Sequence, residues 1–264
     1  MEPSEALTEV WKGAIPVRIT LSIHDVTSLE SPPPMFLLLP RVSYIPLILE
    51  KVIQHFEPHT HTVFKTEEIW FSYNNKVLKW QYPLGVLADS LAGPEIPLPW
   101  HLEVNFNRYP VNVLLPYNGL ASIRTLFLNS LKESCALMTG SANSVMNMSK
   151  QQEDFLWEAS KNRDHSAYWS IAKDFLKLNP EQIRYLPVKF LYFEQYEGYV
   201  MQPLKALDET GEPYTVGEVV KKLFQQELQV VVQGITIPPE THLFWLWNNM
   251  SFPDNFLYVV LSNN

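Results

Sequence analysis

The sequence has 264 residues, of which 46% are hydrophobic and 18% charged, and this composition excludes a mainly disordered chain. Its net charge of −8 argues against a protein that binds nucleic acid through the phosphates, although it leaves room for a basic protein partner. The single cysteine, Cys135, excludes an intrachain disulfide and favours a reducing compartment. An acidic N-terminus and the lack of an apolar run of about 20 residues lead us to expect a soluble, cytoplasmic protein.

A short amphipathic helix is predicted at residues 4–11. Ser4 can cap its start, Trp11 belongs to its apolar face, and Gly13 can end it. Two turns of helix are not stable alone. We therefore expect this helix to dock on its own domain or on a partner.

The next segment has the pattern of a small α+β unit. Its elements are a strand at 15–23, a strand at 35–40, a helix capped by Ser43 that continues to Phe56, two strands at 68–73 and 76–80 joined by a turn at Asn74–Asn75, a short helix within 82–91, and a strand at 100–107. The resulting order β-β-α-β-β-α-β is that of the ubiquitin-like β-grasp.

Residues 119–178 are predicted to be helical. Apolar side chains recur every three or four residues from Leu120 to Met138, then across 145–159, and again across 167–175, and Asn179–Pro180 ends the run. Three such helices would form a small bundle.

The last segment repeats the pattern of the first unit. Strands are predicted at 183–194, 199–207 and 230–237, and a capping box at Thr215–Glu218 opens a helix. Residues 82–107 and 241–262 both read as an apolar helix, a proline-marked turn and a strand. We expect an α+β fold with two ubiquitin-like β-grasp domains that flank a small helical bundle, divided as 1–14, 15–108, 109–182 and 183–264.

Sites of catalysis or metal binding are weakly indicated. Cys135 lies on an apolar helix face with no histidine close in sequence, which is typical of a buried, inert thiol rather than a nucleophile. His55, His59 and His61 resemble a metal cluster, but Pro58 and the loop around them favour solvated histidines. We expect no cofactor, no metal and no catalytic residue.

Several segments resemble the autophagy protein 5 family. They are LLLPRVSY (37–44), EIWF (68–71), the LKW and YPLG motifs within 78–85, LPW (98–100), SLKESCAL (130–137) and SFPDNFL (251–257), and they occur in that family's order. The resemblance covers nearly the whole chain and also implies the ubiquitin-like, helical, ubiquitin-like architecture.

The resemblance implies a non-catalytic scaffold role in autophagy. Family members receive the ubiquitin-like autophagy protein 12 on one lysine through an isopeptide bond, and they bind the N-terminal helix of autophagy protein 16. The complex acts like a ubiquitin ligase and promotes transfer of autophagy protein 8 from its conjugating enzyme to a lipid of the phagophore membrane. By resemblance the acceptor in this chain is Lys132, and the protein is expected to associate peripherally with that membrane.

The residues around Lys132 are compatible with an acceptor role. Aminolysis of a thioester needs an accessible amine, and Lys132 lies at the edge of the apolar helix face, where its amine can reach outward. Glu133 could interact with this lysine or with the incoming enzyme. Arg124 interrupts the same apolar face and needs a partner or an open side; a structural contact is the favoured interpretation, with a contact to the modifier as the other.

Trp11 and Arg41 are the candidates for partner binding, since aromatic and arginine side chains are enriched at binding hot spots. The alternatives are packing of Trp11 on the first ubiquitin-like unit and an ordinary surface position for Arg41. An amphipathic partner helix in a groove between the domains would suit this architecture. A FERM-like membrane–cytoskeleton adaptor is the alternative function, although its third unit would be a pleckstrin-like barrel with a C-terminal helix.

Overall fold

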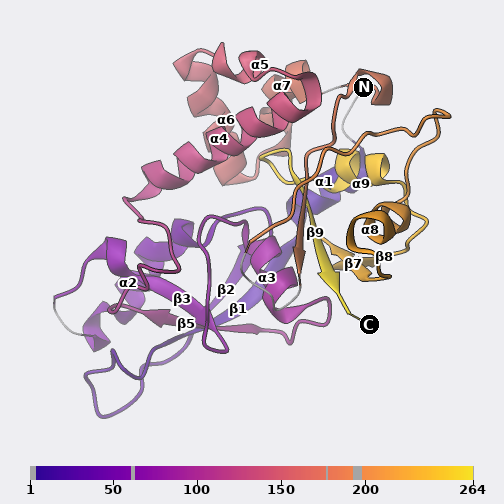
Figure 1. Cartoon of the computed structure of the whole chain (residues 1–264). Helices are drawn as coiled ribbons and strands as arrows, with labels where there is room; N and C mark the ends of the chain where they lie inside the picture. Colours follow the sequence, from indigo (N-terminus) through magenta and orange to yellow (C-terminus); the bar gives the residue numbers. More distant parts are fainter. Residues whose placement is uncertain (1–3, 61–62, 177, 193–197, 264) are drawn as a thin grey trace.

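The computed structural model describes residues 4–60, 63–176, 178–192 and 198–263, and Figure 1 shows their arrangement. The chain forms two small sheets with a group of helices beside them. The N-terminal helix α1 (Glu5–Lys12) lies against a helix of the last segment, α9. Ser4 caps α1 by accepting a hydrogen bond from the Leu7 N–H, and the α-helix ends at Gly13, as the sequence predicts.

The first sheet has the β-grasp order β2-β1-β5-β3-β4. Its strands are β1 (Ala14–Leu21), β2 (Met35–Pro40), β3 (Trp70–Tyr73), β4 (Lys76–Val77) and β5 (Trp100–Asn105), and its helices are α2 (Leu49–Phe56) and α3 (Leu84–Ala92). The central strands β1 and β5 run parallel, and the other pairs are antiparallel. Alternate residues of β1 are buried, which confirms the period of two in its sequence. Asn74 and Asn75 both have positive φ in the predicted hairpin turn.

One prediction for the first sheet is wrong. Ser43 does not cap a helix, because its hydroxyl donates a 2.9 Å hydrogen bond to the Pro40 carbonyl within a turn. The chain then enters a 3₁₀ turn at Ile45–Ile48, with Pro46 in its first positions, before α2 begins. Serine hydroxyls bond local backbone groups in turns as readily as at helix caps, so the residue type alone does not distinguish the two.

The helical part contains α4 (Leu120–Thr139), α5 (Asn143–Met146), α6 (Lys150–Asn162) and α7 (His165–Leu176). The single helix predicted across 145–159 is therefore two helices, α5 and α6. Ser149 starts α6 through a capping box with Gln152, which separates α6 from the short α5. Phe155 is consequently exposed rather than part of the core.

The second sheet has the order β6-β9-β7-β8, with the parallel pair β6 and β9 at one side. Its elements are β6 (Val188–Tyr192), α8 (Val216–Phe224), β7 (Gln229–Val232), β8 (Ile235–Ile237), α9 (Leu243–Met250) and β9 (Leu257–Ser262). The Thr215–Glu218 capping box is confirmed. The predicted strand 230–237 is instead a hairpin that turns at Gln233–Gly234, and 199–207 pairs with β6 only at a Phe190–Val200 bridge. Part of the predicted strand 183–194, and the residues before Gly198, lie outside the described residues.

The two sheets share an apolar layer. Strand β9 is buried on both faces: Leu257, Val259 and Leu261 pack in the core of the second sheet, while Tyr258 and Val260 pack on side chains of the first domain. A strand that is covered on both faces loses the alternation of apolar and polar residues, as LYVVL does. The first sheet and the helical part also share one continuous core. The α+β expectation of two ubiquitin-like sheets and a helical part is confirmed, and the exact domain boundaries stay predictions.

Candidate conjugation and partner-binding sites

Lys132 lies in the second half of α4, at the edge of the buried face of the helix. Its neighbour Leu131 is fully buried, whereas Lys132 itself is partly exposed. Within the described residues no carboxylate forms an ion pair with its amine. The position therefore combines a rigid backbone with an accessible primary amine.

Glu133 pairs with a lysine of the second domain rather than with Lys132. Its carboxylate lies 3.4 Å from Nζ of Lys189, whose side chain is only 5% exposed. The same ammonium lies 3.6 Å from the ring centroid of Phe256 and 4.7 Å from that of Tyr199. A buried ammonium needs such partners, because removing it from water is unfavourable.

Ser134 is the second contact between this turn of α4 and the second domain. The side-chain amide of Asn255 donates hydrogen bonds to the Ser134 hydroxyl at 3.2 Å and to the Met138 sulfur at 2.9 Å. The helical turn that carries Lys132 is thus held against the second ubiquitin-like domain by the Asn255–Ser134 hydrogen bond and the Glu133–Lys189 pair.

Two other residues of α4 have structural roles. Cys135 is fully buried, which confirms the predicted burial, and burial raises the pKa of its thiol to about 11. Arg124 donates to Asp154 at 2.7 Å and reaches Glu153 at 3.5 Å, both on α6. These ion pairs confirm the structural interpretation of Arg124.

The histidines at the end of α2 and after it do not form a site in the described part of the chain. A ring nitrogen of His55 lies 2.9 Å from the Pro33 carbonyl oxygen, and His61 lies outside the described residues. Among residues 4–60, 63–176, 178–192 and 198–263, no group of His, Cys, Asp and Glu side chains has the arrangement of a metal site. In the same ranges, no helix is both long and apolar enough to cross a membrane.

Trp11 docks α1 onto the helical part and is 4% exposed. Its ring lies 5.1 Å from that of His165 and 4.9 Å from that of Tyr168, both on α7. The alternative placed Trp11 on the first ubiquitin-like unit, but its ring contacts lie on α7 of the helical part. The partner-binding role of Trp11 stays a prediction.

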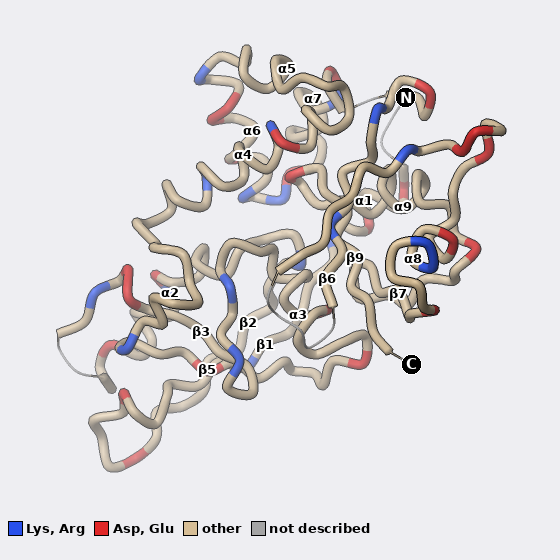
Figure 2. Tube along the Cα trace, in the orientation of Figure 1, with Lys and Arg blue, Asp and Glu red and all other residues tan. Residues whose placement is uncertain are grey.

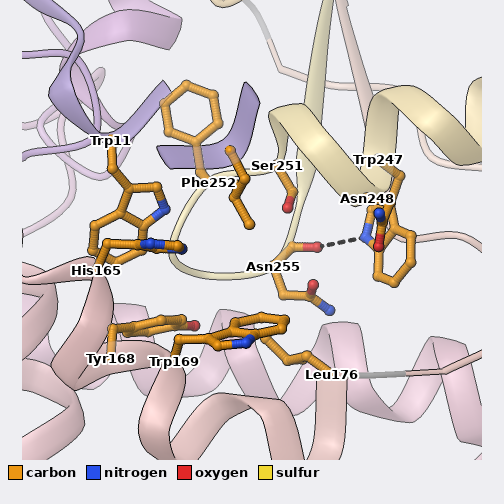
Figure 3. Close-up of a pocket in the computed structure, with 11 residues that line it drawn as sticks. Trp11, His165, Tyr168, Trp169, Leu176, Trp247, Asn248, Ser251, Phe252 and Asn255 are labelled. Carbon is orange, nitrogen blue, oxygen red and sulfur yellow. Dashed lines mark hydrogen bonds between the residues drawn. The ribbon is translucent and has the colours of Figure 1, made fainter. Parts of the chain in front are cut away.

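A small cavity opens beside Trp11, where α1, α7 and α9 meet (Figure 3). It has a volume of about 30 Å³ and is lined mainly by aromatic side chains: Trp11, His165, Tyr168, Trp169 and Trp247. Across it, the Trp247 indole donates to the Asn255 carbonyl at 3.1 Å.

Two polar atoms of this cavity lack a partner. His165 Nε2 and Trp169 Nε1 are buried and have no hydrogen-bond partner in the described chain. Burial also lowers the pKa of His165, which favours the neutral ring. Buried polar groups are normally bonded, so these two nitrogens are exceptions in the described part of the chain.

The alternative of an ordinary surface position for Arg41 is wrong. Its side chain is 12% exposed and forms an ion pair with Asp89 of α3 at 2.5 Å. It also donates to the Gly85 carbonyl at 3.3 Å and reaches the Gln233 side chain at 3.5 Å. Because Gln233 belongs to the hairpin of the second sheet, Arg41 joins the two ubiquitin-like domains. A direct contact of Arg41 with a partner stays a prediction.

Several of these residues are not found by motif reasoning. Asp89, Lys189 and Asn255 make long-range contacts, and His165 and Trp169 line the cavity. A signal exists for the first two, since Asp89 interrupts the apolar helix LGVLADSLA and Lys189 interrupts the strand VKFLY. A charge inside an apolar element indicates a buried partner, although it does not say which one.

Family models match most of the chain in three consecutive segments. They are described as the autophagy protein ATG5 UblA domain at residues 10–106, its alpha-helical bundle region at 120–178, and its UblB domain at 185–261. The chain belongs to the autophagy protein 5 family.

Relatives support the same assignment. Autophagy protein 5 of Arabidopsis thaliana is 28% identical over 97% of this chain and 96% of its own length. Autophagy protein 5 of Oryza sativa subsp. indica is 39% identical over 67% of this chain and 46% of the rice protein. The crystal structure of Kluyveromyces marxianus Atg5 superposes with a TM-score of 0.86 at 22% identity, covering 98% of this chain and all of that one, and so shows the same fold.

Membership of the autophagy protein 5 family makes this an autophagy protein with two ubiquitin-like domains. The FERM-like alternative is wrong, because the last unit is a second ubiquitin-like sheet that ends in β9 rather than a barrel that ends in a helix.

Proposed function

We propose that this autophagy protein 5 family member is a non-catalytic scaffold that receives autophagy protein 12 on Lys132 and binds the N-terminal helix of autophagy protein 16. The complex would act like a ubiquitin ligase in the lipidation of autophagy protein 8. In this proposal the protein is cytoplasmic and reaches the phagophore membrane peripherally, through its partners. The observation that carries the proposal is the placement of Lys132 on a helical turn fixed by its two neighbours.

The chemistry at Lys132 is aminolysis. The neutral amine attacks the thioester carbonyl carbon that links the modifier to its conjugating enzyme, the C–N bond forms, the C–S bond breaks and the enzyme thiolate leaves. The nitrogen loses a proton in the same sequence. An amine without a carboxylate partner is free for this attack, and a fixed backbone reduces the orientational freedom that the reaction must remove.

Replacing the acceptor tests this part. Lys132→Arg keeps the charge and the helix propensity but removes the nucleophilic amine. We expect the variant to fold and to lose the covalent adduct in a reconstituted reaction with the activating and conjugating enzymes and autophagy protein 12. Lys173→Arg, an exposed lysine of α7, is the matched control and should conjugate normally. An undiminished adduct on Lys132→Arg would refute the assignment.

The cavity between α1, α7 and α9 supports the partner-helix part of the proposal. It lies where the N-terminal helix, the helical part and the second ubiquitin-like domain meet, and it offers aromatic walls with two unpartnered ring nitrogens. An amphipathic helix could pack over these aromatic walls and bury apolar area there.

Calorimetry with the autophagy protein 16 N-terminal peptide tests this docking. Trp169→Phe keeps an aromatic ring but removes part of its apolar area, and we expect it to weaken binding about fivefold, since less apolar area is buried with the peptide. Trp245→Phe alters an exposed tryptophan on another face of α9 and should bind normally. Equal affinities for the two variants would mean that the peptide binds to another surface of the protein.

A further inference from the structure

Gln233 has an unusual backbone conformation for its residue type. It forms, with Gly234, the two-residue turn between β7 and β8, and the two residues have φ of +53° and +78°. A turn with positive φ at both positions favours asparagine before the glycine, because asparagine tolerates the left-handed region better than most side chains. Turn residues are also usually exposed, whereas Gln233 is only 7% exposed. A buried glutamine in this conformation indicates a role for its side chain.

The side chain of Gln233 connects the end of α9 to Arg41. Its Nε2 donates a 3.1 Å hydrogen bond to the Met250 carbonyl in the last turn of α9. Its Oε1 lies 3.5 Å from Nε of Arg41, at the long end of hydrogen-bond distances. The last carbonyls of an α-helix have no donor within the helix, so Gln233 provides one of them with its partner.

Arg41 extends this connection to the end of α1. Its backbone N–H donates a 2.9 Å hydrogen bond to the carbonyl of Gly13, which directly follows α1. A Cβ on Gly13 would lie 3.3 Å from Cδ of Arg41, so the two residues approach closely. The guanidinium is held by the Asp89 carboxylate and the Gly85 carbonyl. The ends of α1 and α9 are therefore joined through Arg41 and Gln233.

The two helices that are joined in this way line the aromatic cavity. Leu7 and Trp11 line it from α1, and Trp247 and Asn248 line it from α9. Figure 3 shows Trp11 and Trp247 on opposite sides of the cavity. Because α1 has only two turns and is not stable alone, its position depends on its tertiary contacts. A partner helix that packs over the cavity meets side chains of both helices, so its affinity depends on how they are placed relative to each other.

We propose that Gln233 is a positioning residue for the partner-helix site, which fixes α9 relative to α1 through Arg41. This inference rests on the proposed docking of an amphipathic helix at the aromatic cavity. Gln233 is buried and is not among the residues that line the cavity, so it acts without touching the partner. Its side chain is one methylene longer than that of asparagine, and this length lets the amide reach Met250 from the turn. A site that is preformed in this way does not have to be ordered when the partner binds.

Replacing Gln233 by asparagine tests the proposal. Gln233→Asn suits positive φ but is too short to join Met250 and Arg41. We expect calorimetry with the same partner peptide to show an affinity about fivefold lower, the factor that corresponds to one hydrogen bond. Gln225→Asn is the matched control, because Gln225 has a φ of +56° and an exposed side chain at the end of α8, the helix whose basic residues are blue in Figure 2. The control should bind normally, and an equally normal affinity in Gln233→Asn would overturn the proposal.

Two further variants separate positioning from general stability. Val219 is buried in the core of the second domain and does not line the cavity. Val219→Ala should lower the midpoint of urea unfolding at least as much as Gln233→Asn does, yet leave the affinity unchanged. Arg41→Lys removes the planar group that meets Gln233, and combining it with Gln233→Asn should add little to the loss of affinity, because both variants break the same connection. Additive losses, or an equal loss of affinity in Val219→Ala, would contradict the positioning role.

A measurement without the peptide distinguishes this inference from the proposed docking. In the ¹⁵N-labelled protein, the indole N–H signals of Trp11 and Trp247 should shift in Gln233→Asn. The Trp247 indole, which donates to the Asn255 carbonyl at 3.1 Å, should also exchange faster with solvent. Gln225→Asn should leave both signals in place, and unchanged signals in Gln233→Asn would overturn the inference. Shifted signals with no peptide binding by the unmodified protein would support the connection between the helices and refute the docking.

Discussion

The carboxylate of Asp89 in the first ubiquitin-like domain accepts a 2.9 Å hydrogen bond from the backbone N–H of Gly234 in the second. The same carboxylate pairs with Arg41, so a single buried anion connects a strand end, a helix and the hairpin of the other domain. Burial raises the pKa of Asp89, whereas Arg41 and the Gly234 N–H act in the opposite direction. The connection is directional, unlike the apolar layer beside it, and it fixes how the two sheets meet.

Removing Asp89 should therefore be strongly destabilising. Asp89→Ala leaves the Arg41 guanidinium buried without its anion, and breaking a buried pair in this way lowers the free energy of unfolding by about 3–5 kcal/mol. Urea denaturation followed by tryptophan fluorescence measures the change. Glu9→Gln breaks an ion pair with Lys12 whose two side chains are mostly exposed, and it should have a far smaller effect. A similar loss in the two variants would mean that the buried pair contributes no more than a surface one.

Gly234 should be intolerant of a side chain. Its φ is +78°, and a Cβ there would lie 2.9 Å from a guanidinium nitrogen of Arg41. Gly211 has a similar φ of +90° but open space around it, which makes it a matched control. Gly211→Ala should lower the free energy of unfolding by about 1 kcal/mol through backbone strain alone. Gly234→Ala should lower it at least twice as much, because the ion pair must also shift; equal losses would contradict the close approach.

Local sequence patterns predict those elements that are held by contacts between residues close in sequence. The alternation in β1, the Asn74–Asn75 turn and the Thr215 capping box are all formed by residues close in sequence. The hairpin at 233–234 was missed because VVVQGITI reads as one apolar run, with a single glycine as the turn signal. A glycine within such a run is compatible with a bulge or a strand as well as with a turn.

Sequence reasoning could place Lys132 on a helix but not its surroundings. The contacts that fix its turn join Glu133 to Lys189 and Ser134 to Asn255, residues that are far apart in the chain. The same is true of Arg41 and Asp89, where the arginine was expected at a surface. Pairings of this kind depend on how whole domains pack, and no local spacing encodes them.

Cys135 should react with thiol reagents only after unfolding. Burial raises its pKa from an ordinary value of 9.0 to about 11, which leaves about a hundredfold less thiolate at pH 8 than the unfolded chain has. Burial further blocks access of the reagent. We expect the reaction with a chromogenic disulfide at pH 8 to follow the unfolding rate, and to become immediate in concentrated urea. A fast reaction of the native protein would show that α4 opens locally at this position.

Asp254 should make stability depend on pH, and Lys189 should weaken that dependence. Burial raises the pKa of the Asp254 carboxyl above its ordinary value of 3.8, and the charge of Lys189 opposes the rise. A folded-state pKa above the unfolded value means that the folded state binds the proton more tightly, so this group's contribution to stability falls as pH rises through that window. Lys189→Met removes the opposing charge and should raise the pKa of Asp254 further.

The destabilisation by Lys189→Met should consequently be small at low pH, where Asp254 is protonated in the folded state, and should grow toward pH 7. Thermal unfolding at a series of pH values measures it. The double variant Lys189→Met with Asp254→Asn is the control, since it has no carboxyl to titrate, and the difference between the two variants should vanish at low pH. A loss in Lys189→Met that is constant across the range would instead assign the role of Lys189 to its packing on Phe256.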